Sequence, residues 1–366
     1  MTGKPRTHAS PPRNDERGYF DSAPTLDLVA IDHPYRRLPK VAVVTGAAGF
    51  IGSHLVEALL NRGVEVRGLD NMSTGSEENL ADIARRAGRN WHRFELITGD
   101  IRSPDDCEHA LRGADTVFHE AALNSVPRSL QIPITVAENN VLGMATLLHT
   151  AVSVGVERFI FASSSSVYGN VPDMVRREDL LGVALSPYAA SKQAAESFAR
   201  CYHEMGNISV TGLRYFNVFG PRQNPHGPYS AVVPRWIQAM TEGRDVQIYG
   251  DGKQQRDFTH VANIVHANLL ACDTSCGGGE IFNVGTQRAI SLLDLFDTIK
   301  ATTVEVTGSE DITTHMPSFT DERPGDVRSA SADLTKINTV LGYGPVVDFT
   351  RGMQQTVGWF VDHQRS

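Results

Sequence analysis

The segment from residue 41 to residue 70 constrains the fold more than any other part of this 366-residue chain. It begins with the apolar, β-branched run Val41–Val44, which is typical of a buried parallel strand. Leucine and valine then recur at helical spacing in Ser53–Arg62, which predicts an amphipathic helix. A second strand-like run, Val64–Leu69, ends at Asp70. This order predicts a strand–helix–strand unit of a parallel sheet.

Three glycines, Gly46, Gly49 and Gly52, separate the first strand from the helix. They let the backbone turn tightly, let a pyrophosphate approach the helix N-terminus, and let helix and strand pack closely. Asp70 at the end of the second strand can accept hydrogen bonds from both hydroxyls of an adenosine ribose, and it would repel a 2′-phosphate. A plain structural turn is the alternative, but the surrounding strand, helix and acid favour a binding site for NAD over NADP.

The wide spacing of these glycines and seven later motifs resemble the extended branch of the short-chain dehydrogenase/reductase superfamily, whose members modify nucleotide sugars. The eight motifs are Thr45–Gly52, Leu69–Asn71, Gly99–Ile101, His119–Ala122, Ser163–Gly169, Tyr188–Lys192, Arg214–Asn217 and Arg256–Phe258. The resemblance extends from about Val41 nearly to the C-terminus. Within the branch, Ala121–Ser129 is most similar to bacterial UDP-N-acetylglucosamine 4-epimerases.

Strand-like runs alternate with helical patterns after the glycine turn, which predicts an α/β chain with a doubly wound, Rossmann-like parallel sheet. The expected strands are Val64–Leu69, His92–Ile97, Thr116–His119, Arg158–Ala162 and Val210–Tyr215, with helices such as Val141–Val154 and Tyr188–Glu204 between them. The resemblance implies an NAD-binding domain over 40–217, to which 257–285 returns. It implies a smaller mixed α/β domain that binds the nucleotide sugar over 218–256 and 286–366.

Composition narrows the class of protein. A hydrophobic content of 41% supports a sizeable core, and a net charge of -8 argues against a nucleic-acid or membrane-surface partner. No apolar run approaches the ~20 residues of a membrane span. The four cysteines are Cys107, Cys201, Cys272 and Cys276. They predict neither a disulfide framework nor a metal site, and the simplest interpretation is a reduced, cytoplasmic protein.

Residues 1–39 have mixed charge and no apolar periodicity. We expect neither a secretory signal nor a transit peptide there. A partly disordered arm is favoured over a lid or dimer arm anchored by Tyr19, Phe20 and Tyr35.

Tyr188 and Lys192 are the expected centre of the chemistry. A tyrosine with a pKa near 10 is a poor base at neutral pH unless a cation stabilises its phenolate, and a lysine four residues later lies on the same helix face. Tyr249 and Lys253 have the same spacing, but a glycine turn separates them. Tyr188 is therefore the expected base.

A serine run, Ser163–Ser166, follows a strand whose end would lie beside the cofactor. By the resemblance, Ser164 holds the reacting sugar hydroxyl and relays its proton to Tyr188. Dehydratases and decarboxylases of the branch carry an acid where this chain has Ser166, so elimination of water is not expected.

The resemblance implies further contacts with cofactor and substrate. The cofactor residues are Gly46, Gly49, Phe50, Ile51, Gly52, Asp70, Asn71, Ser73, Thr74, Gly75, Asp100, Ile101, Ala121, Ala122, Asn140, Tyr188, Lys192 and Tyr215. The substrate residues are Ser125, Arg128, Ser164, Ser165, Asn217, Ala231, Val232, Trp236, Gln247, Tyr249, Arg256, Arg323, Asp326 and Ala330.

Several of these substrate residues have specific expected roles. Arg256 and Arg323 would clamp the diphosphate, with surface ion pairs as the alternative. Asp326 would meet a ribose or base, and core packing competes for Val232 and Trp236. Ala330 leaves room for an N-acetyl group where glucose-restricted relatives carry a tyrosine.

The expected activity is redox-neutral 4-epimerisation of UDP-GlcNAc/UDP-GalNAc or UDP-Glc/UDP-Gal through a 4-keto sugar, with tightly held NAD. The alternatives are an epimerase of UDP-glucuronate or of another specialised nucleotide sugar, a net oxidoreductase, and a catalytically inactive nucleotide-binding module. The intact Ser164, Tyr188 and Lys192 argue against the last. By the same resemblance, Val141–Val154 and Tyr188–Glu204 pair across a two-fold axis, so a homodimer is expected, with Phe198 and Met205 as surplus apolar side chains.

Overall fold

A seven-stranded parallel sheet organises the chain. The computed structural model describes residues 33–206, 208–226, 230–273, 278–322 and 328–364. The strands, in spatial order, are β12 (Ile281–Val284), β7 (Ser209–Tyr215), β5 (Arg158–Ser164), β4 (Thr116–His119), β1 (Val41–Thr45), β2 (Glu65–Asp70) and β3 (Phe94–Thr98). The chain order reverses between β1 and β4, and ligands of such sheets bind where the order reverses, at the carboxyl ends of the strands. The predicted Rossmann-like α/β class is confirmed, and the predicted strands differ from the observed ones only at their ends.

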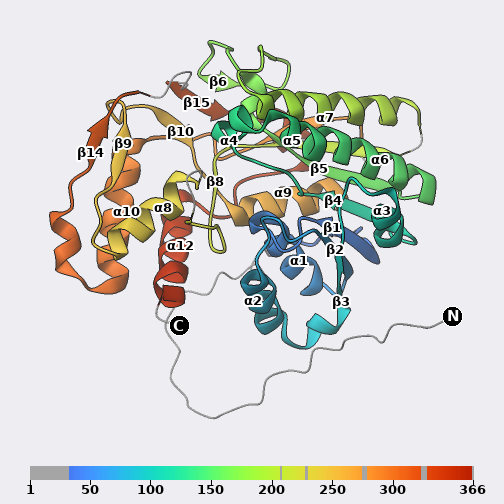
Figure 1. Ribbon diagram of the computed structural model, residues 1–366, viewed down its shortest axis with the longest axis horizontal. Coiled ribbons are helices and arrows are strands. Elements are labelled where there is room, and N and C mark those ends of the chain that lie inside the picture. Colours follow the sequence, from blue (N-terminus) through green and yellow to red (C-terminus); the bar gives the residue numbers. More distant parts are fainter. Residues whose placement is uncertain (1–32, 207, 227–229, 274–277, 323–327, 365–366) are drawn as a thin grey trace.

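Helices cover both faces of this sheet (Figure 1). The helices α1 (Phe50–Leu60), α2 (Glu77–Ala87) and α9 (Val261–Asp273) lie on one face, where Leu59 and Ile264 share an apolar core. The other face carries α3 (Pro104–Leu111), α6 (Gly143–Val154) and α7 (Pro187–Glu204), with Leu147 and Phe159 in a second core. The short helices α4 (Val126–Gln131) and α5 (Pro133–Ala137) and a π-helical turn, Glu138–Leu142, precede α6.

A smaller group of elements has its own core beside the sheet (Figure 1). It contains α8 (Val232–Thr241), β9 (Gln247–Tyr249), α10 (Leu292–Thr307), β14 (Ser318–Thr320) and α12 (Phe349–Gln364). Trp236, Phe296 and Met353 are buried together there. A small sheet orders β13 (Ala289–Ser291), β10 (Gln255–Asp257), β15 (Ser329–Ala332) and β6 (Val175–Arg176), while β8 (Val218–Phe219) pairs with β11 (Thr259–His260).

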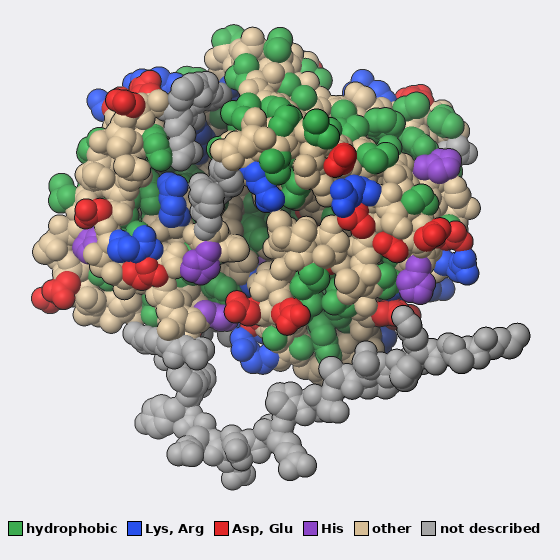
Figure 2. Space-filling model, in the orientation of Figure 1, with side chains coloured by type: hydrophobic (Ala, Val, Ile, Leu, Met, Phe, Trp, Pro, Cys, Tyr) green, Lys and Arg blue, Asp and Glu red, His purple; other side chains and the backbone are tan. Residues whose placement is uncertain are grey.

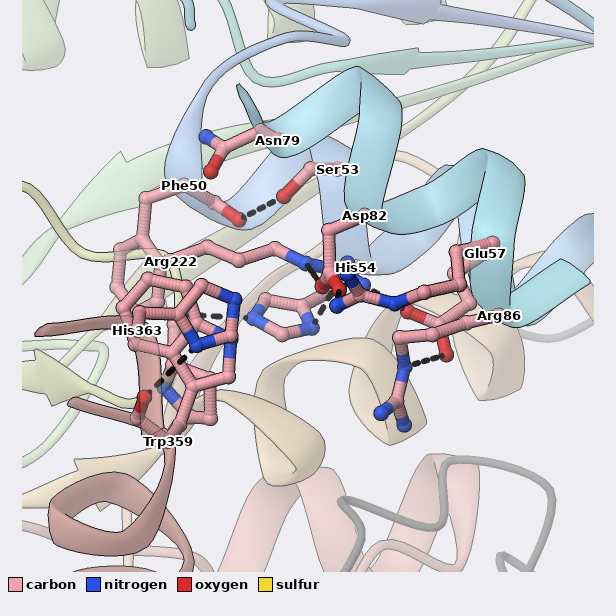
Figure 3. A network of polar contacts seen from close by, with 12 residues as sticks. Phe50, Ser53, His54, Glu57, Asn79, Asp82, Arg86, Arg222, Trp359 and His363 are labelled. Carbon is pink, nitrogen blue, oxygen red and sulfur yellow. Dashed lines mark hydrogen bonds and ion pairs between the residues drawn. The ribbon is translucent and has the colours of Figure 1, made fainter. Parts of the chain in front are cut away.

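The helix α1 differs from the prediction, because it is buried on all sides rather than amphipathic. Its polar residues Ser53, His54 and Glu57 are at most 2% exposed. The cover comes from Arg222, which follows β8 and reaches between Glu57 on α1 and Asp82 on α2 (Figure 3). Arg222 Nε donates to Asp82 Oδ2 at 2.7 Å. The polar face of α1 therefore faces a buried cation instead of water.

Two further contacts complete what we call the Arg222 cluster: Arg222, Glu57, Asp82, His54 and Arg86. The His54 ring bonds through Nε2 to the Pro221 carbonyl at 3.0 Å, and Arg86 Nε donates to Glu57 Oε1 at 2.8 Å. Burial and the neighbouring Arg222 guanidinium hold the pKa of His54 well below its usual range, so its ring is neutral. The cluster therefore holds the segment after β8 against the helices α1 and α2.

Candidate active site

The glycine turn between β1 and α1 is as tight as the sequence predicts. Gly46 has a φ of +66°, and a Cβ there would lie 2.9 Å from the Ala121 nitrogen. A Cβ on Gly52 would lie 2.1 Å from the Gly46 oxygen, so only glycine fits. Among the described residues, α1 begins after Gly49 without a side-chain cap and has no acid in its first turn. An uncapped helix N-terminus in a glycine turn suits a pyrophosphate, so this cradle fits a dinucleotide.

Asp70, at the end of β2, lies beside this cradle. Its Oδ2 accepts from the Ala48 N–H at 2.9 Å and its Oδ1 from the Met72 N–H at 2.8 Å. A Cβ on Gly75 would lie 3.1 Å from Oδ1, and the exposed Ser73 and Thr74 lie in the same loop. The carboxyl is thus fixed beside the glycine turn, as selection of NAD over NADP requires.

Asp100 and Ile101 follow β3, next to this loop. Asn71 Nδ2 donates to Asp100 Oδ2 at 3.0 Å. Hydrogen bonds from Arg102 hold the pKa of Asp100 well below its usual range. The predicted cofactor residues Asn71 and Asp100 therefore touch each other across two strand ends.

Asn140, in the π-helical turn, uses its amide within the protein. It exchanges two hydrogen bonds with the backbone of Leu123, at 2.8 and 3.0 Å, and donates to Ser191 Oγ at 3.0 Å. It thereby joins the loop after β4, which contains Ala121 and Ala122, to α7. Asn140 therefore supports the loop after β4.

The three expected catalytic residues come together where β5 ends and α7 begins. Ser164 is the last residue of β5, and Tyr188 follows Pro187 at the start of α7. Lys192 lies one turn later, with Nζ 6.0 Å from the centre of the Tyr188 ring and 2.7 Å from the Ala162 carbonyl oxygen. Tyr188 and Lys192 are nearly fully buried. The second tyrosine–lysine pair does not form such a unit, since Lys253 is exposed beyond two left-handed glycines, Gly250 and Gly252.

Burial dominates the electrostatics of this group. It raises the pKa of Tyr188, while a hydrogen bond with Ser164 lowers it. Burial also lowers the pKa of Lys192 to about 8, against the opposing charges of Glu120 and Glu196. The Lys192 ammonium therefore loses its proton only slightly above neutral pH.

Glu196 was not anticipated from the sequence, and it holds this group in place. Arg214 on β7 clamps it with two hydrogen bonds, at 2.9 and 2.8 Å, and Ser163 Oγ donates to it at 2.5 Å. All three side chains are buried. The available signal was its position four residues after Lys192, on the same face of α7. Glu120 and Asn268, both bonded to Tyr215, were also missed.

A pocket in the smaller unit gathers six of the expected substrate residues. Its lining consists of Asn217, Val232, Arg235, Trp236, Gln247, Tyr249, Gln254, Arg256, Phe258 and Leu292. Figure 2 shows this face of the molecule hollowed near its centre, between the smaller unit and the sheet. The other four lining residues, Arg235, Gln254, Phe258 and Leu292, were not among the expected substrate residues. Trp236 fits both the substrate-binding and the core-packing interpretation. It lines the pocket, and it is also 1% exposed and packs edge-on against Phe296.

The other expected substrate residues are not part of this pocket's lining, and two of them lie outside the described residues. Ala330 pairs with Arg256 across β10 and β15. Ala231 precedes α8, and Ser165 begins the turn after β5. Ser125 caps α4, accepting from the Arg128 N–H at 3.2 Å. Arg323 and Asp326 lie outside the described residues, as do Tyr19, Phe20 and Cys276.

In the described ranges, no group of three or more His, Cys, Asp or Glu side chains could hold a metal ion. Within the same ranges, no helix has the length and apolar character needed to cross a membrane.

Comparisons with known proteins agree with this geometry. Residues 42–285 match the NAD dependent epimerase/dehydratase family. The UDP-glucose 4-epimerase of Mycolicibacterium smegmatis is 37% identical over 325 residues, 87% of this chain and 97% of that protein. The structure of a UDP-N-acetylglucosamine 4-epimerase from Methanobrevibacter ruminantium is similar at 36% identity, with a TM-score of 0.80 over 88% of this chain and 99% of that one.

A UDP-glucose 4-epimerase from Thermus thermophilus, solved with NAD, is 33% identical with a TM-score of 0.76, and the match covers 88% of this chain and 99% of that one. Other relatives of similar identity are named as a decarboxylase or as dehydratases. The names therefore agree on nucleotide-sugar chemistry and differ in the reaction. The chain belongs to the NAD dependent epimerase/dehydratase family, and its cofactor is NAD.

Proposed function

We propose that this protein interconverts the C4 epimers of a UDP-sugar, either UDP-GlcNAc and UDP-GalNAc or UDP-Glc and UDP-Gal. One observation carries the choice of epimerase over dehydratase. The side chain beside Ser164 is the neutral hydroxyl of Ser166, which hydrogen-bonds Ser164 Oγ at 3.0 Å. Loss of water from a sugar needs an acid that protonates the departing hydroxyl, and a serine is too weak an acid for that step.

The proton steps belong to Tyr188, Ser164 and Lys192. Ser164 holds the C4 hydroxyl of the sugar and passes its proton to the Tyr188 phenolate, which returns a proton after the sugar has turned. The Lys192 ammonium stabilises that phenolate. NAD held by the glycine turn and Asp70 would supply reversible hydride transfer at C4 of the sugar. Because nothing is exchanged with the solution, the cofactor stays in place through many turnovers.

The pocket of the smaller unit supports a nucleoside diphosphate as the part of the substrate that is held. Arg235 and Arg256 bring two cations to its wall, which suits a diphosphate. Gln247 and Gln254 offer amides to a base. Trp236 Nε1 is buried without a partner among the described residues, so it is a donor available to a ligand oxygen.

The width of the sugar site is proposed to depend on Ala330. Its neighbour across the strands is Arg256, which lines the pocket, so position 330 adjoins the pocket wall. An alanine leaves space for an N-acetyl group at C2. The proposal therefore includes N-acetylated sugars, and the division into a 40–217 NAD-binding domain and a nucleotide-sugar domain belongs to the same proposal.

A panel of nucleotide sugars tests this function. The purified protein is incubated with UDP-GlcNAc, UDP-Glc, UDP-glucuronate and dTDP-glucose, and products are separated by chromatography and identified by NMR. We expect C4 epimers without net NADH. Release of NADH would support an oxidoreductase instead, a 4-keto-6-deoxy product would support a dehydratase, and turnover of UDP-glucuronate alone would support that epimerase.

The variant Ala330→Tyr separates the sugars. If Ala330 bounds the C2 pocket, the variant loses turnover of UDP-GlcNAc and keeps turnover of UDP-Glc. Ala330→Ser is the matched control, since it adds little volume and keeps both. Equal loss on both sugars in Ala330→Tyr would remove Ala330 from the pocket.

We also propose that the protein is a homodimer. Apolar side chains on α4, α5, α7 and the turn before α6 are exposed, among them Leu130 at 64%, Ile134 at 74% and Met205 at 62%. A second copy of the same surface would cover them.

A further inference from the structure

Glu120 is an acid that the mechanism above does not use, although it lies beside Tyr188 and Lys192. It directly follows β4, at the edge of the sheet where the strands end. Its backbone borders the glycine turn, since a Cβ on Gly46 would lie 3.2 Å from the Glu120 carbonyl carbon. The residue therefore stands between the turn that suits the pyrophosphate and the residues that move the proton.

The Glu120 carboxyl is held in one orientation. Its Oε1 accepts from the Tyr215 hydroxyl on β7 at 2.7 Å. That hydroxyl accepts from Asn268 Nδ2 on α9 at 2.8 Å. The other oxygen, Oε2, is buried and has no partner among the described residues. Among the described residues, no hydrogen bond joins Glu120 to Tyr188 or Lys192, so its carboxyl can act on them only through its charge.

The groups that face Glu120 are few. From α7 come Lys192 and Tyr188, and the Glu120 charge acts on the pKa of both. From β7 comes Tyr215, whose pKa burial and Glu120 raise well above its usual range. The contact from α9 is Asn268, which does not titrate, and the adjacent His119 is neutral because burial lowers its pKa to about 3. Burial raises the pKa of Glu120 itself to about 7, against the Tyr215 hydrogen bond and the Lys192 charge.

We propose that Glu120 is a positioning residue that sets the pH range in which the Tyr188–Lys192 pair works. Its negative charge makes it harder for either residue to lose a proton, so it keeps Lys192 cationic at neutral and mildly basic pH. This inference rests on the proposed function, in which Tyr188 is the base.

The sign of the effect follows from the charges. When Glu120 is ionised, it opposes formation of the Tyr188 phenolate and favours the Lys192 ammonium. Removing that charge lowers the pH at which each residue loses its proton. On the acid side of neutrality Glu120 is itself protonated, so its removal changes less there. The substitution Glu120→Gln therefore moves the basic limb of the pH profile more than the acid limb.

The test compares three variants of the NAD-loaded protein. The pH profiles of kcat and kcat/KM are measured, and tyrosine ionisation is followed by ultraviolet absorbance, with Tyr188→Phe subtracted to isolate Tyr188. In Glu120→Gln we expect the basic limb to fall by on the order of one pH unit, as the loss of one neighbouring unit charge produces. Glu120→Asp keeps the charge, so its pH profile should match that of the wild type. Tyr215→Phe removes a hydrogen bond that lowers the pKa of Glu120 but leaves the carboxyl in place, so its basic limb should shift in the same direction as that of Glu120→Gln and by less.

Two results would overturn the inference. One is a Glu120→Gln protein whose limbs and Tyr188 titration coincide with the wild type. The other is a Tyr215→Phe protein with a shift as large as that of Glu120→Gln, which would assign the effect to the hydrogen bond. Retention of activity in Tyr188→Phe would instead refute the proposed function, so the two failures are distinguishable.

Discussion

In the proposed mechanism the phenol oxygen of Tyr188 is the proton acceptor. The substitution Tyr188→Phe removes the phenol oxygen and little volume, so it removes the proton acceptor while the surrounding packing is kept. We expect epimerase activity to fall by at least the ~10²–10⁴-fold typical of a lost acid–base group. NAD content, measured after denaturation, should remain at the wild-type level. Tyr202→Phe on the same helix is the control, and both its activity and its NAD content should be normal.

The charge of Asp70 is the second feature at this scale. Asp70→Asn keeps the shape of the side chain but removes the charge and one acceptor for the ribose hydroxyls. The affinity for NAD should fall roughly tenfold, about the value of one hydrogen bond to a charged group. The affinity for NADP should change less or rise, because the repulsion of its 2′-phosphate is gone. Calorimetric titration of the cofactor-free protein with both cofactors measures the ratio, and an unchanged preference would contradict the role of Asp70.

At the scale of elements, the main feature is the Arg222 cluster, whose buried ion pairs join the segment after β8 to α1 and α2. Arg222 is 1% exposed between two carboxylates, and Arg222→Met would leave Glu57 and Asp82 buried without that partner. Breaking a buried ion pair in this way costs about 3–5 kcal/mol of unfolding free energy. Urea denaturation followed by circular dichroism measures the loss.

Arg85 provides a matched control for this prediction. It also pairs with Asp82, but its side chain is 69% exposed. An exposed pair contributes only about 0–1 kcal/mol, so Arg85→Met should unfold close to the wild-type midpoint. Similar midpoints for the two variants would mean that the buried cluster adds no more than a surface pair.

What the sequence could predict differs between local and distant contacts. The glycine turn, Asp70 and the Tyr188–Lys192 pair are local patterns that can be recognised within a few residues of sequence, and the structure puts them at the ends of β1 and β2 and at the start of α7. The burial of α1 was missed because its cover, Arg222, lies 165 residues from Glu57 along the chain. Glu120 was missed for the same reason, since its partner Tyr215 is on β7. Glu196 offered only its helical spacing from Lys192, because its partner Arg214 is also on β7.

At the scale of the whole molecule, the exposed apolar surface on α4, α5 and α7 predicts a dimer. Light scattering at micromolar concentration should give twice the mass of one chain. Ile134→Glu places a charge where side chains of two copies would meet, so we expect it to give monomers. Met316→Glu is the control, because Met316 is 72% exposed away from these helices. A monomeric wild type would contradict the proposal, as would a Met316→Glu protein that dissociates equally.

The Arg222 cluster also bears on how this chain can be recombined with its relatives. A designer who exchanges the sugar-binding half to obtain a new specificity would naturally cut after Asn217, where the last central strand has ended. That cut would separate Arg222 from Glu57 and Asp82, the two buried acids that its guanidinium bonds. An incoming half with another residue at this position would leave both buried carboxylates without this partner. A workable cut lies after Arg222, or Glu57 and Asp82 must be exchanged together with it. The boundary for such an exchange therefore differs from the boundary at the end of the last central strand.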